Sequence, residues 1–488
     1  MNKDLLIFER GEQGRRCTVF PEVDGSAAPI PEGMRRRSAP ALPEVSELEL
    51  MRHYVGLSTM NFSIDTAFYP LGSCTMKYNP KVHEWAARLP EMTGLHPFAD
   101  EASAQPALQI LWEMEQVLRE VTGMDGFTFQ PAAGAHGEFV GISLIAAYHR
   151  ERGDPKRVFL IPDSAHGTNP ATAAMCGYTV TAVKSTDRGT VDTSDLRDKM
   201  NDQVAGLMLT NPNTFGVFED EILEIEAIVH RGGGLLYYDG ANLNALLGQC
   251  RPGDMGFDVV HLNLHKTFTT PHGGGGPGSG PVGVKQSLVP HLPVPVVVRD
   301  GDAYRLDYDR PLSIGKVSSF WGNFGMVLRA YVYSLMLGGE GMRRTGEMAV
   351  LNANYLAKCL EGLFDRPKKA QPMHEMVLSA SRQKREQGIT ALDIAKRLID
   401  LGYHPPTIYF PLPNVAPEAM LVEPTETESL DTLDAFAEAM AQIAREAETS
   451  PDLLREAPHD TPVRRLDEAT AARKPVLRWR APDEREAG

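Results

Sequence analysis

The pattern of apolar and polar residues predicts an α/β protein from about residue 125 onward. Short apolar runs alternate there with helical stretches, which is typical of βαβ units and a mostly parallel sheet. The predicted strands are Phe127–Phe129, Val158–Ile161, Thr179–Val183, Gly206–Leu209, Leu235–Tyr238 and Val259–Leu262. The helical stretches between them include Glu138–Arg152 and Asp220–Arg231. An amphipathic helix over residues 104–122 precedes them, with apolar residues three or four apart and Gly123 as its stop.

The pattern changes again in the last third of the chain. Residues 326–365 predict a long helix interrupted at Gly338-Gly339, and shorter strands and helices follow. The strands are predicted at Met376–Ser379, Thr407–Phe410 and Ala419–Val422, and the helices at Ala391–Leu401 and Ser429–Glu448. We therefore expect a mostly parallel central sheet flanked by helices, with a smaller C-terminal α+β domain. The expected parts are an extended N-terminal arm (1–60), a large α/β domain (61–350), the small domain (351–450) and a flexible tail (451–488).

Composition narrows the class of protein. The formal net charge is −15, from 64 acidic and 49 basic side chains, which argues against a nucleic-acid surface. The five cysteines are scattered and never form a C-x-x-C pair, so a disulfide framework is not expected and a reducing compartment fits. No apolar run is long enough to span a membrane, and the first residues lack the features of a secretory signal. These observations favour a cytoplasmic protein.

The first candidate for chemistry is Lys266, in the string Asn263-Leu264-His265-Lys266-Thr267. The string follows a predicted strand, and ligands of α/β sheets bind outside the carboxyl ends of strands. A partly desolvated lysine there can bond covalently to an aldehyde. Alone, Lys266 is more simply explained as a surface lysine.

A second candidate changes that balance. Asp239 ends the apolar run Leu235–Tyr238 and precedes Lys266 by 27 residues, with room for one strand between them. Pyridoxal 5′-phosphate (PLP) needs a carboxylate beside its pyridine nitrogen, because the protonated ring is the better electron sink. Ala241 is small enough to pack against such a ring. The competing interpretation of Asp239 is a turn or capping acid.

Two further strand ends complete the set. His166 lies in Asp163-Ser164-Ala165-His166-Gly167-Thr168, where an imidazole could stack on the ring and move protons. Gly134-Ala135-His136-Gly137 leads from a strand into a helix, where backbone N–H groups favour a phosphate. Each is weak evidence alone, since a loop histidine or a glycine-rich turn is common. Together with Asp239 and Lys266 they predict a PLP site.

Two other sites are disfavoured. The glycine run Gly273–Gly276 lacks a following Gly-Lys-Ser/Thr and is interrupted by Pro277, so it fits neither a P-loop nor a dinucleotide fingerprint. His261 and His265 are four apart but lie at a strand end, and no His-Glu-x-x-His pattern occurs. No metal is therefore expected.

Longer strings resemble the glycine cleavage system P-protein family, glycine dehydrogenase (decarboxylating). They run over about residues 55–440, and together they are far more specific than a lysine and an acid. The strings are Pro70–Lys77, Ser164–Pro170, Tyr238–Ala245, Asn263–Gly283, Met373-His374-Glu375 and Val422–Glu426. The length is similar to that of the PLP-bearing second subunit of the two-chain form.

The resemblance implies fold type I of PLP enzymes and an aminomethyl-transferring glycine dehydrogenase, an oxidoreductase acting on a CH–NH2 group. It implies glycine as substrate, the lipoyl arm of an H-protein as acceptor, and a related subunit 1 as partner, with two copies of each. The residues it assigns to the cofactor are Lys266, Asp239, Ala241, His166, Thr168, Gly134, Ala135, His136 and His265, together with Asn211 at the phenolic oxygen. Lys266 and His166 would be catalytic.

The segment Leu71–Lys77 is expected to close the glycine pocket, with Ser73, Thr75 and Lys77 as candidate contacts. A surface lysine remains the alternative for Lys77, and a buried inert thiol is the ordinary interpretation of Cys74. Two alternatives for the whole chain stay open: another fold type I PLP amino-acid decarboxylase or aminotransferase, and a cofactor-free structural subunit.

Overall fold

The computed structural model describes residues 5–478 apart from residues 20, 22–24, 26–29, 39, 41, 369, 412 and 413. The chain forms two compact units, Met1–Ala67 and Phe68–Gly488. Each is described by itself. The four-part division expected from the sequence remains a proposal.

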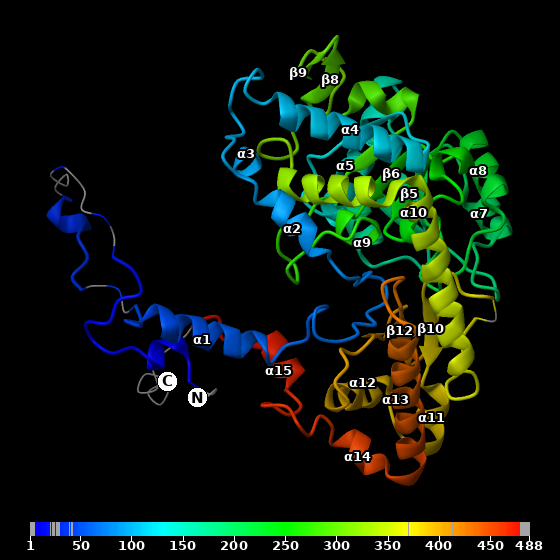
Figure 1. Ribbon diagram of the computed structural model, residues 1–488. Coiled ribbons are helices and arrows are strands. Elements are labelled where there is room, and N and C mark those ends of the chain that lie inside the picture. The colour runs from blue at the N-terminus through cyan, green and yellow to red at the C-terminus, as the bar shows by residue number, and fades with distance from the viewer. Residues whose placement is uncertain are drawn as a thin grey trace. The chain divides into compact units, whose positions relative to one another are not determined.

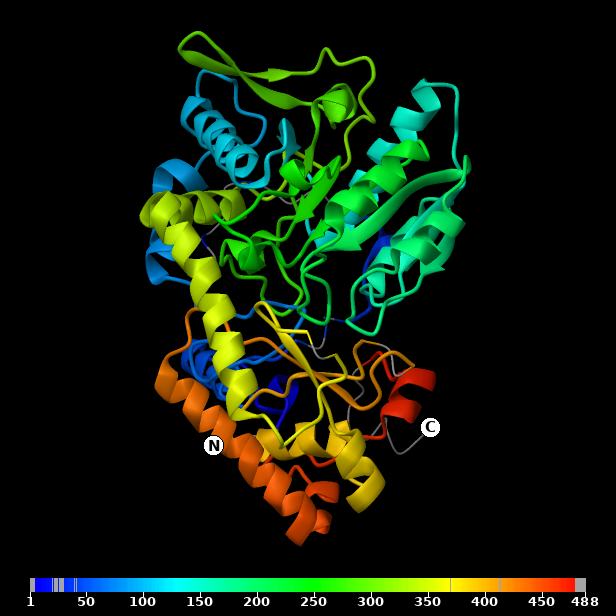
Figure 2. The ribbon, with the colours of Figure 1, turned by 90° about the vertical axis from the view of Figure 1, so that its right-hand side faces the viewer.

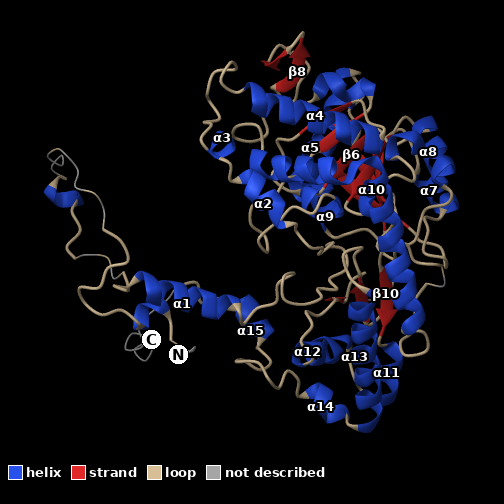
Figure 3. Cartoon of the chain, in the orientation of Figure 1, coloured by secondary structure: helices blue, strands red, loops and turns tan. Residues whose placement is uncertain are grey.

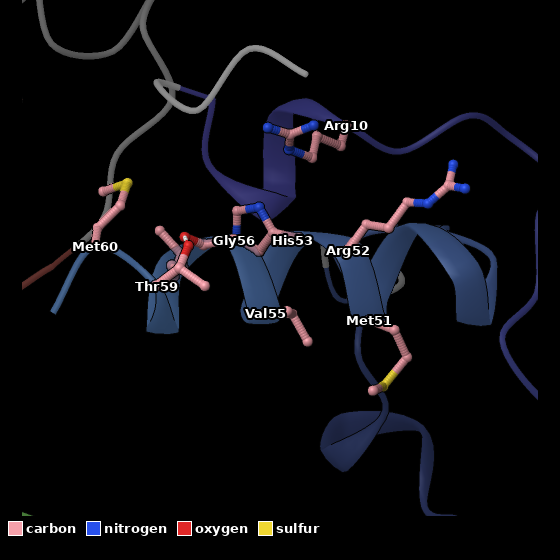
Figure 4. Close-up of a pocket in the computed structure, with 9 residues that line it drawn as sticks. Arg10, Met51, Arg52, His53, Val55, Gly56, Thr59 and Met60 are labelled. Atoms are coloured by element: carbon pink, nitrogen blue, oxygen red, sulfur yellow. Dashed lines mark hydrogen bonds between the residues drawn. The ribbon is translucent and has the colours of Figure 1, made fainter. Parts of the chain in front are cut away.

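The first unit is built around one helix, α1 (Glu47–Ser58), with the 3₁₀ turns η1 (Ile7–Glu9) and η2 (Glu32–Met34). Ser46 caps α1, because its hydroxyl accepts from the Glu49 N–H and the Glu49 carboxylate accepts from the Ser46 N–H at 2.9 Å. A pocket of ≈ 370 Å³ runs along the helix, and Met51 and Val55 project from the same side of α1 in Figure 4. None of the predicted site residues lines this pocket.

The second unit contains a seven-stranded sheet with the order β1-β7-β6-β5-β4-β2-β3. Strands β2 to β6 are mutually parallel, whereas β7 is antiparallel to both β6 and β1 (Figure 2). The mostly parallel sheet predicted from the sequence is therefore confirmed. The strands are β1 (Gly126–Thr128), β2 (Val158–Pro162), β3 (Thr179–Val183), β4 (Val204–Thr210), β5 (Leu235–Gly240), β6 (Val259–Leu262) and β7 (Val282–Val284).

Helices cover both faces of this sheet, which explains why its strands are apolar throughout (Figure 3). On β5, for example, Leu236 and Tyr238 belong to one core cluster and Leu235 and Tyr237 to the other. The helices of this lobe are α2 (Lys81–Ala87), α3 (Pro90–Thr93), α4 (Gln105–Thr122), α5 (Gly134–Glu151), α6 (Thr168–Met175), α7 (Thr193–Lys199), α8 (Ile222–Arg231) and α9 (Leu264–Thr267). The 3₁₀ turns are η3 (Leu243–Ala245), η4 (Pro252–Met255) and η5 (Gln286–His291), and β8 (Val296–Asp300) with β9 (Ala303–Asp307) forms a separate hairpin.

A long helix, α10 (Phe324–Cys359), leads from the sheet to a smaller α+β lobe (Figure 1). Gly338 breaks its regularity with φ 60°, ψ −177°, where the glycine pair predicted an interruption. The smaller lobe has a three-stranded antiparallel sheet of order β10-β12-β11. Its elements are β10 (Met376–Ser379), α11 (Ser381–Gln387), α12 (Ala391–Asp400), β11 (Thr407–Ile408), β12 (Ala419–Val422), α13 (Leu430–Thr449), α14 (Pro451–Arg455) and α15 (Glu468–Arg473).

The expectation of a flexible tail from residue 451 does not hold for its first part. Leu454 is fully buried in the core of the small lobe, and the Arg465 guanidinium lies 2.7 Å from the Asp393 carboxylate. The expectation rested on the overall composition of the tail, and composition does not reveal a single buried leucine or a single ion pair. Residues 479–488 lie outside the described part of the chain. Within the described part, no helix is both long and apolar enough to cross a membrane.

His230 ties α8 to the sheet and predicts a pH-dependent stability. Its Nδ1 lies 2.5 Å from Glu226 and its Nε2 lies 2.7 Å from Asp258, and the hydrogen bond with Asp258 raises the pKa of His230 to about 9. A raised pKa in the folded state means that this stabilisation is complete below pH 6.5 and is lost as the pH rises through 9. We expect the loss to be on the order of 1 kcal/mol, since the ring is partly exposed. Urea unfolding between pH 6 and 10 measures it, and a His230→Gln variant should lack this component.

Candidate active site

A cavity of ≈ 290 Å³ lies at the carboxyl ends of the parallel strands of the large lobe. Thr210 ends β4, Asp239 lies at the end of β5, and Asn263 follows β6, as expected where consecutive parallel strands present their ends at one edge. Residues of the small lobe complete the wall. The lining residues are Ser73, Cys74, Gly134, Ala135, Glu138, His166, Thr168, Thr210, Thr214, Asp239, Ala241, Asn242, His261, Asn263, His265, Lys266, Glu375 and Phe410.

Lys266 reaches the cavity from α9, the single turn after β6. The residue is 8% exposed, and its Nζ donates to the Ser73 carbonyl oxygen at 2.7 Å. Ser73 has a positive φ of 63°, which is uncommon for a residue other than glycine and directs its peptide groups toward the lysine loop. The amine is therefore buried and held by a neutral acceptor, as a lysine that bonds to an aldehyde requires.

Asp239 is buried at the same edge and is surrounded by donors. Its carboxylate accepts from the Asn169 amide at 2.9 Å and from the Ala241 N–H at 3.0 Å, and His261 Nε2 lies 3.3 Å away. Burial alone raises the pKa of Asp239, but His261, the Asn169 hydrogen bond and Lys266 outweigh burial and lower it. Asp239 therefore remains a carboxylate that can hold a proton on a neighbouring nitrogen.

A second layer of polar groups lies behind Asp239. The Tyr237 hydroxyl and His261 Nδ1 are 2.9 Å apart, so His261 is fixed from both sides. Glu138 on α5 accepts from the Thr168 hydroxyl at 2.7 Å, and burial together with repulsion from Asp239 raises the pKa of Glu138 to about 7. The protein thus concentrates the negative charge of this corner on Asp239.

His166 lines the cavity from the loop between β2 and α6. Its Nδ1 lies 2.8 Å from the Thr168 hydroxyl, and its ring packs edge-on against Phe410 of the small lobe, with centroids 5.2 Å apart. Burial lowers the pKa of His166, which favours the neutral ring at physiological pH. A neutral imidazole can both stack on a flat ring and exchange a proton.

The start of α5 can accept a phosphate. Ala133 precedes the helix and provides no side-chain cap, so the first N–H groups of α5 are available to an anion. A Cβ on Gly134 would lie 2.0 Å from Asn263 Oδ1, so only glycine allows this close approach of the helix to the lysine loop.

Orphaned buried atoms at the cavity indicate that it is built for a polar group. Thr210 Oγ1, Asn263 Oδ1 and His265 Nδ1 are buried without a hydrogen-bond partner within the chain. Such atoms cost free energy unless a ligand or water pairs with them. Lys266, the ionised Asp239, the open N-terminus of α5 and these atoms fit the aldehyde, the ring nitrogen, the phosphate and the remaining polar groups of PLP.

The side chains of two residues predicted to bind the cofactor do not line the cavity. His136 is not part of the cavity wall, and its Nδ1 accepts from the Ala132 N–H at 3.2 Å. Asn211 is fully buried, and its Oδ1 accepts from the Glu219 N–H at 3.0 Å. Each follows a lining residue directly, Ala135 or Thr210, and the N–H of His136 belongs to the first turn of α5, so both assignments to the cofactor stay predictions. Thr168, Ala241, Gly134, Ala135 and His265 do line the cavity.

Of the three residues predicted to contact glycine, only Ser73 lines the cavity. Thr75 and Lys77 are buried between the lobes, where Thr75 donates to Glu423. Lys77 Nζ lies 2.7 Å from Glu426 and donates to the Thr267 carbonyl oxygen at 2.9 Å. Burial alone lowers the pKa of Lys77, but Glu426 and Tyr333 outweigh it and raise the pKa. Lys77 therefore stabilises the position of the segment rather than contacting a ligand in this cavity.

We expect Lys77→Met to lower the free energy of unfolding by about 3–5 kcal/mol, because it leaves the Glu426 carboxylate buried without its cation. The double variant Lys77→Met, Glu426→Gln should recover part of that loss, since neither charge remains. The exposed pair Arg188–Asp220 provides the control, and Arg188→Met should cost less than about 1 kcal/mol. Chemical unfolding measures all three, and equal losses at the buried and exposed pairs would contradict the assignment.

Several lining residues were not predicted from the sequence. Glu138, His261, Asn263, Thr210, Asn242 and Glu375 line the cavity. Asn263 could have been predicted, since it begins the segment Asn263–Thr267 that contains Lys266. Glu375 belongs to Met373-His374-Glu375, one of the segments that resemble the family. Nothing in the spacing indicates that Glu375, on the small lobe, faces Lys266.

Comparison with known proteins identifies the family. The family described as glycine cleavage system P-protein matches residues 24–305, and the glycine dehydrogenase C-terminal domain matches residues 345–460. The chain belongs to the glycine cleavage system P-protein family. A probable glycine dehydrogenase (decarboxylating) subunit 2 from Halalkalibacterium halodurans is 58% identical, covering 98% of this chain and 99% of the relative. A relative with the same description from Pyrococcus abyssi is 55% identical, covering 97% and 95%.

Solved structures show how the P-protein fold relates to other enzymes. A glycine decarboxylase (P-protein) in inhibitor-bound form superposes with a TM-score of 0.72 at 20% identity, covering 85% of this chain and 93% of the other. Glutamate decarboxylase from Lactobacillus brevis superposes with a TM-score of 0.63 at 12% identity, covering 89% and 96%. The predicted fold type I of PLP enzymes is confirmed, and the family and fold together imply PLP dependence.

Proposed function

We propose that this chain decarboxylates glycine with PLP and transfers the remaining aminomethyl group to the lipoyl arm of an H-protein. It would act as the second subunit of an aminomethyl-transferring glycine dehydrogenase. One observation carries the proposal. Lys266 and the ionised Asp239 meet in one cavity, in a chain that matches glycine dehydrogenase subunit 2 sequences over 98% of its length.

Lys266 and Asp239 would have different roles toward the cofactor. Lys266 would hold the cofactor covalently and release it to the amine of glycine. Bound PLP supplies an electron-accepting ring for the electron pair left when carbon dioxide departs. Asp239 keeps the ring nitrogen protonated, and the Asn169 and Ala241 donors hold its carboxylate in place.

His166 and the start of α5 position the reactants. The His166 ring would stack on the cofactor, and Thr168 orients its Nδ1. The N–H groups of Gly134 and Ala135 would bind the phosphate. The buried walls would exclude water and fix the orientation of glycine relative to the cofactor, which supplies the electron-accepting ring.

The assembly is the finer part of the proposal. The description "subunit 2" of the relatives supports a partner subunit 1 for this chain. We propose an assembly of two copies of each subunit, with a lipoylated H-protein as co-substrate.

Exchange of bicarbonate carbon into the carboxyl group of glycine tests the proposal. The purified chain with its partner should catalyse this exchange, and lipoylated H-protein should strongly stimulate it. Consumption of a bulkier amino acid without H-protein would instead indicate another PLP decarboxylase or aminotransferase. A colourless protein that supports an active partner would indicate a structural subunit.

A further inference from the structure

Two buried glutamates from the small lobe lie beside Lys266 and have no role in the mechanism above. Glu375 precedes β10 and is 0% exposed, and Glu423 follows β12 and is 1% exposed. The two carboxyl groups and the His374 ring each place one atom within 4.8 Å of the others. Glu375 also lines the cavity.

Ser73 connects this group to the reactive amine. The Ser73 carbonyl oxygen accepts from Lys266 Nζ at 2.7 Å, and the Ser73 N–H donates to Glu375 Oε2 at 2.8 Å. The N–H and the carbonyl of one residue are only a few bonds apart, so Glu375 lies close to Lys266. Asn242 Nδ2 donates to the other oxygen of Glu375 at 3.2 Å, which fixes the carboxyl plane.

The surroundings leave too little positive charge to ionise both acids. The titratable groups around them are Lys266, His374, Cys74 and the Lys77–Glu426 pair. Lys77 is already paired with Glu426, and burial lowers the pKa of His374 to about 3, so that ring is neutral. Burial and the repulsion of Glu423 raise the pKa of Glu375 to about 8.

Glu423 is held next to Glu375 as a second acid. Burial raises the pKa of Glu423 to about 7, and its Oε1 accepts from the Thr75 hydroxyl. Its Oε2 and both ring nitrogens of His374 are buried without a hydrogen-bond partner. The cluster therefore retains unused hydrogen-bonding capacity next to the cavity, as expected where a reacting group enters.

The proposed reaction requires one proton at the departing lipoyl sulfur, and none of the roles given above places a donor there, since His166 is assigned to the face of the cofactor ring. When carbon dioxide leaves, the electron pair on the methylene carbon forms a C–S bond with one lipoyl sulfur. The S–S bond breaks and its electron pair stays on the second sulfur, so the disulfide is reduced and the carbon oxidised. The departing sulfur must then be protonated to give the thiol. Zwitterionic glycine carries its ionisable protons on the amine only, and a protonated aminomethyl product keeps all of them, so the proton for the thiol comes from another group.

We propose that Glu375, which contacts Lys266 through Ser73, is the general acid that protonates the departing lipoyl sulfur, with the adjacent buried Glu423 as its positioning residue. The inference rests on the proposed function. Glu375 donates its proton as the S–S bond breaks, and its carboxylate regains a proton from solvent once the arm has left. General acid catalysis of this kind contributes about 10²–10⁴-fold to a rate.

The decisive experiment compares two disulfides in single turnovers of the assembled enzyme with glycine. One is the lipoyl arm, whose departing thiol has an ordinary pKa. The other is a mixed disulfide whose departing group is an arylthiol of low pKa, which leaves without a proton. Glu375→Gln should slow thiol release from the lipoyl arm about 10²-fold and release of the arylthiol by less than about threefold.

A control variant and a second readout separate catalysis from structure. Glu428→Gln replaces another partly buried glutamate of the same lobe, outside the cavity, and should leave both rates unchanged. Infrared pH-difference spectra of the full chain without cofactor should show a carboxylic-acid C=O band that fades as the pH rises through about 8, above the pKa of about 7 of Glu138 and Glu423. This band should be missing from the difference spectrum of Glu375→Gln, whereas the bands that titrate near pH 7 remain.

Each contrary result has a definite meaning. Equal slowing of both disulfides by Glu375→Gln would indicate a structural role and overturn the inference, as would an unchanged rate or the absence of the band. Either leaves the proposed function standing. If the wild-type enzyme transfers nothing from glycine to either disulfide, the proposed function fails and the inference fails with it.

Discussion

Lys266→Ala should abolish glycine-dependent exchange, with a loss of at least about 10³-fold, because no other amine lines the described cavity to hold the cofactor aldehyde. The variant should also retain no cofactor after borohydride reduction. Reduced wild-type protein should carry the cofactor covalently on the peptide that contains Lys266. Absorbance and peptide mass measure both effects.

Lys184→Ala is the matched control for this substitution. Lys184 follows β3 in the same lobe and is exposed, so its loss should change neither colour nor exchange rate. Full activity in a colourless Lys266→Ala variant would refute the cofactor assignment. Equal losses in the two variants would point to damage of the fold instead.

Asp239→Asn should lower the exchange rate by about 10³-fold while leaving the covalent bond at Lys266 intact. The amide preserves the size of the side chain but removes the charge that keeps the ring nitrogen protonated. The variant should therefore bind cofactor with a changed absorption spectrum and fail mainly in kcat. Separate measurement of kcat, KM and the spectrum distinguishes this from loss of cofactor.

Asp220→Asn controls for loss of a carboxylate elsewhere in the lobe. Asp220 is exposed and pairs with Arg188, so its amide should leave kcat within about twofold of the wild-type value, as expected for a weak surface pair. An Asp239→Asn enzyme that keeps its spectrum and kcat would exclude Asp239 as the partner of the ring nitrogen.

Much of the fold could be predicted because burial on both faces makes the central strands continuously apolar. The runs at Leu235–Tyr238 and Val259–Leu262 correspond to β5 and β6, and the helix predicted over residues 104–122 is α4. β7 was missed, since three residues that follow a glycine and a proline carry almost no periodic signal. The β8–β9 hairpin was missed as well, because it lies outside the central sheet and its partly exposed strands mix apolar and charged residues.

At the site, the sequence indicates the loops that surround the cavity but not the direction of individual side chains. His136 lies in the predicted phosphate loop but faces the Ala132 N–H, and Asn211 follows β4 but turns toward Glu219. The side chain of a loop residue faces either the cavity or the core, and its direction depends on partners far away in sequence. Lys77 shows the same dependence, because its partner Glu426 lies 349 residues away.

The sequence by itself determined the order of the strand ends and the chemistry that they carry: Asp239 at the end of β5 and Lys266 after β6. Local apolar runs and the small residues that follow them are sufficient for this, because adjacent parallel strands present their ends at one edge. Only the tertiary structure decided that Glu375 and Lys266 both form hydrogen bonds with Ser73, although Glu375 is 302 residues from Ser73 in the sequence. The proximity of Glu375 and Glu423 and their burial away from water arise when the small lobe closes one wall of the cavity. Both effects raise the pKa of a carboxyl group, and neither can be read from the residues that flank it.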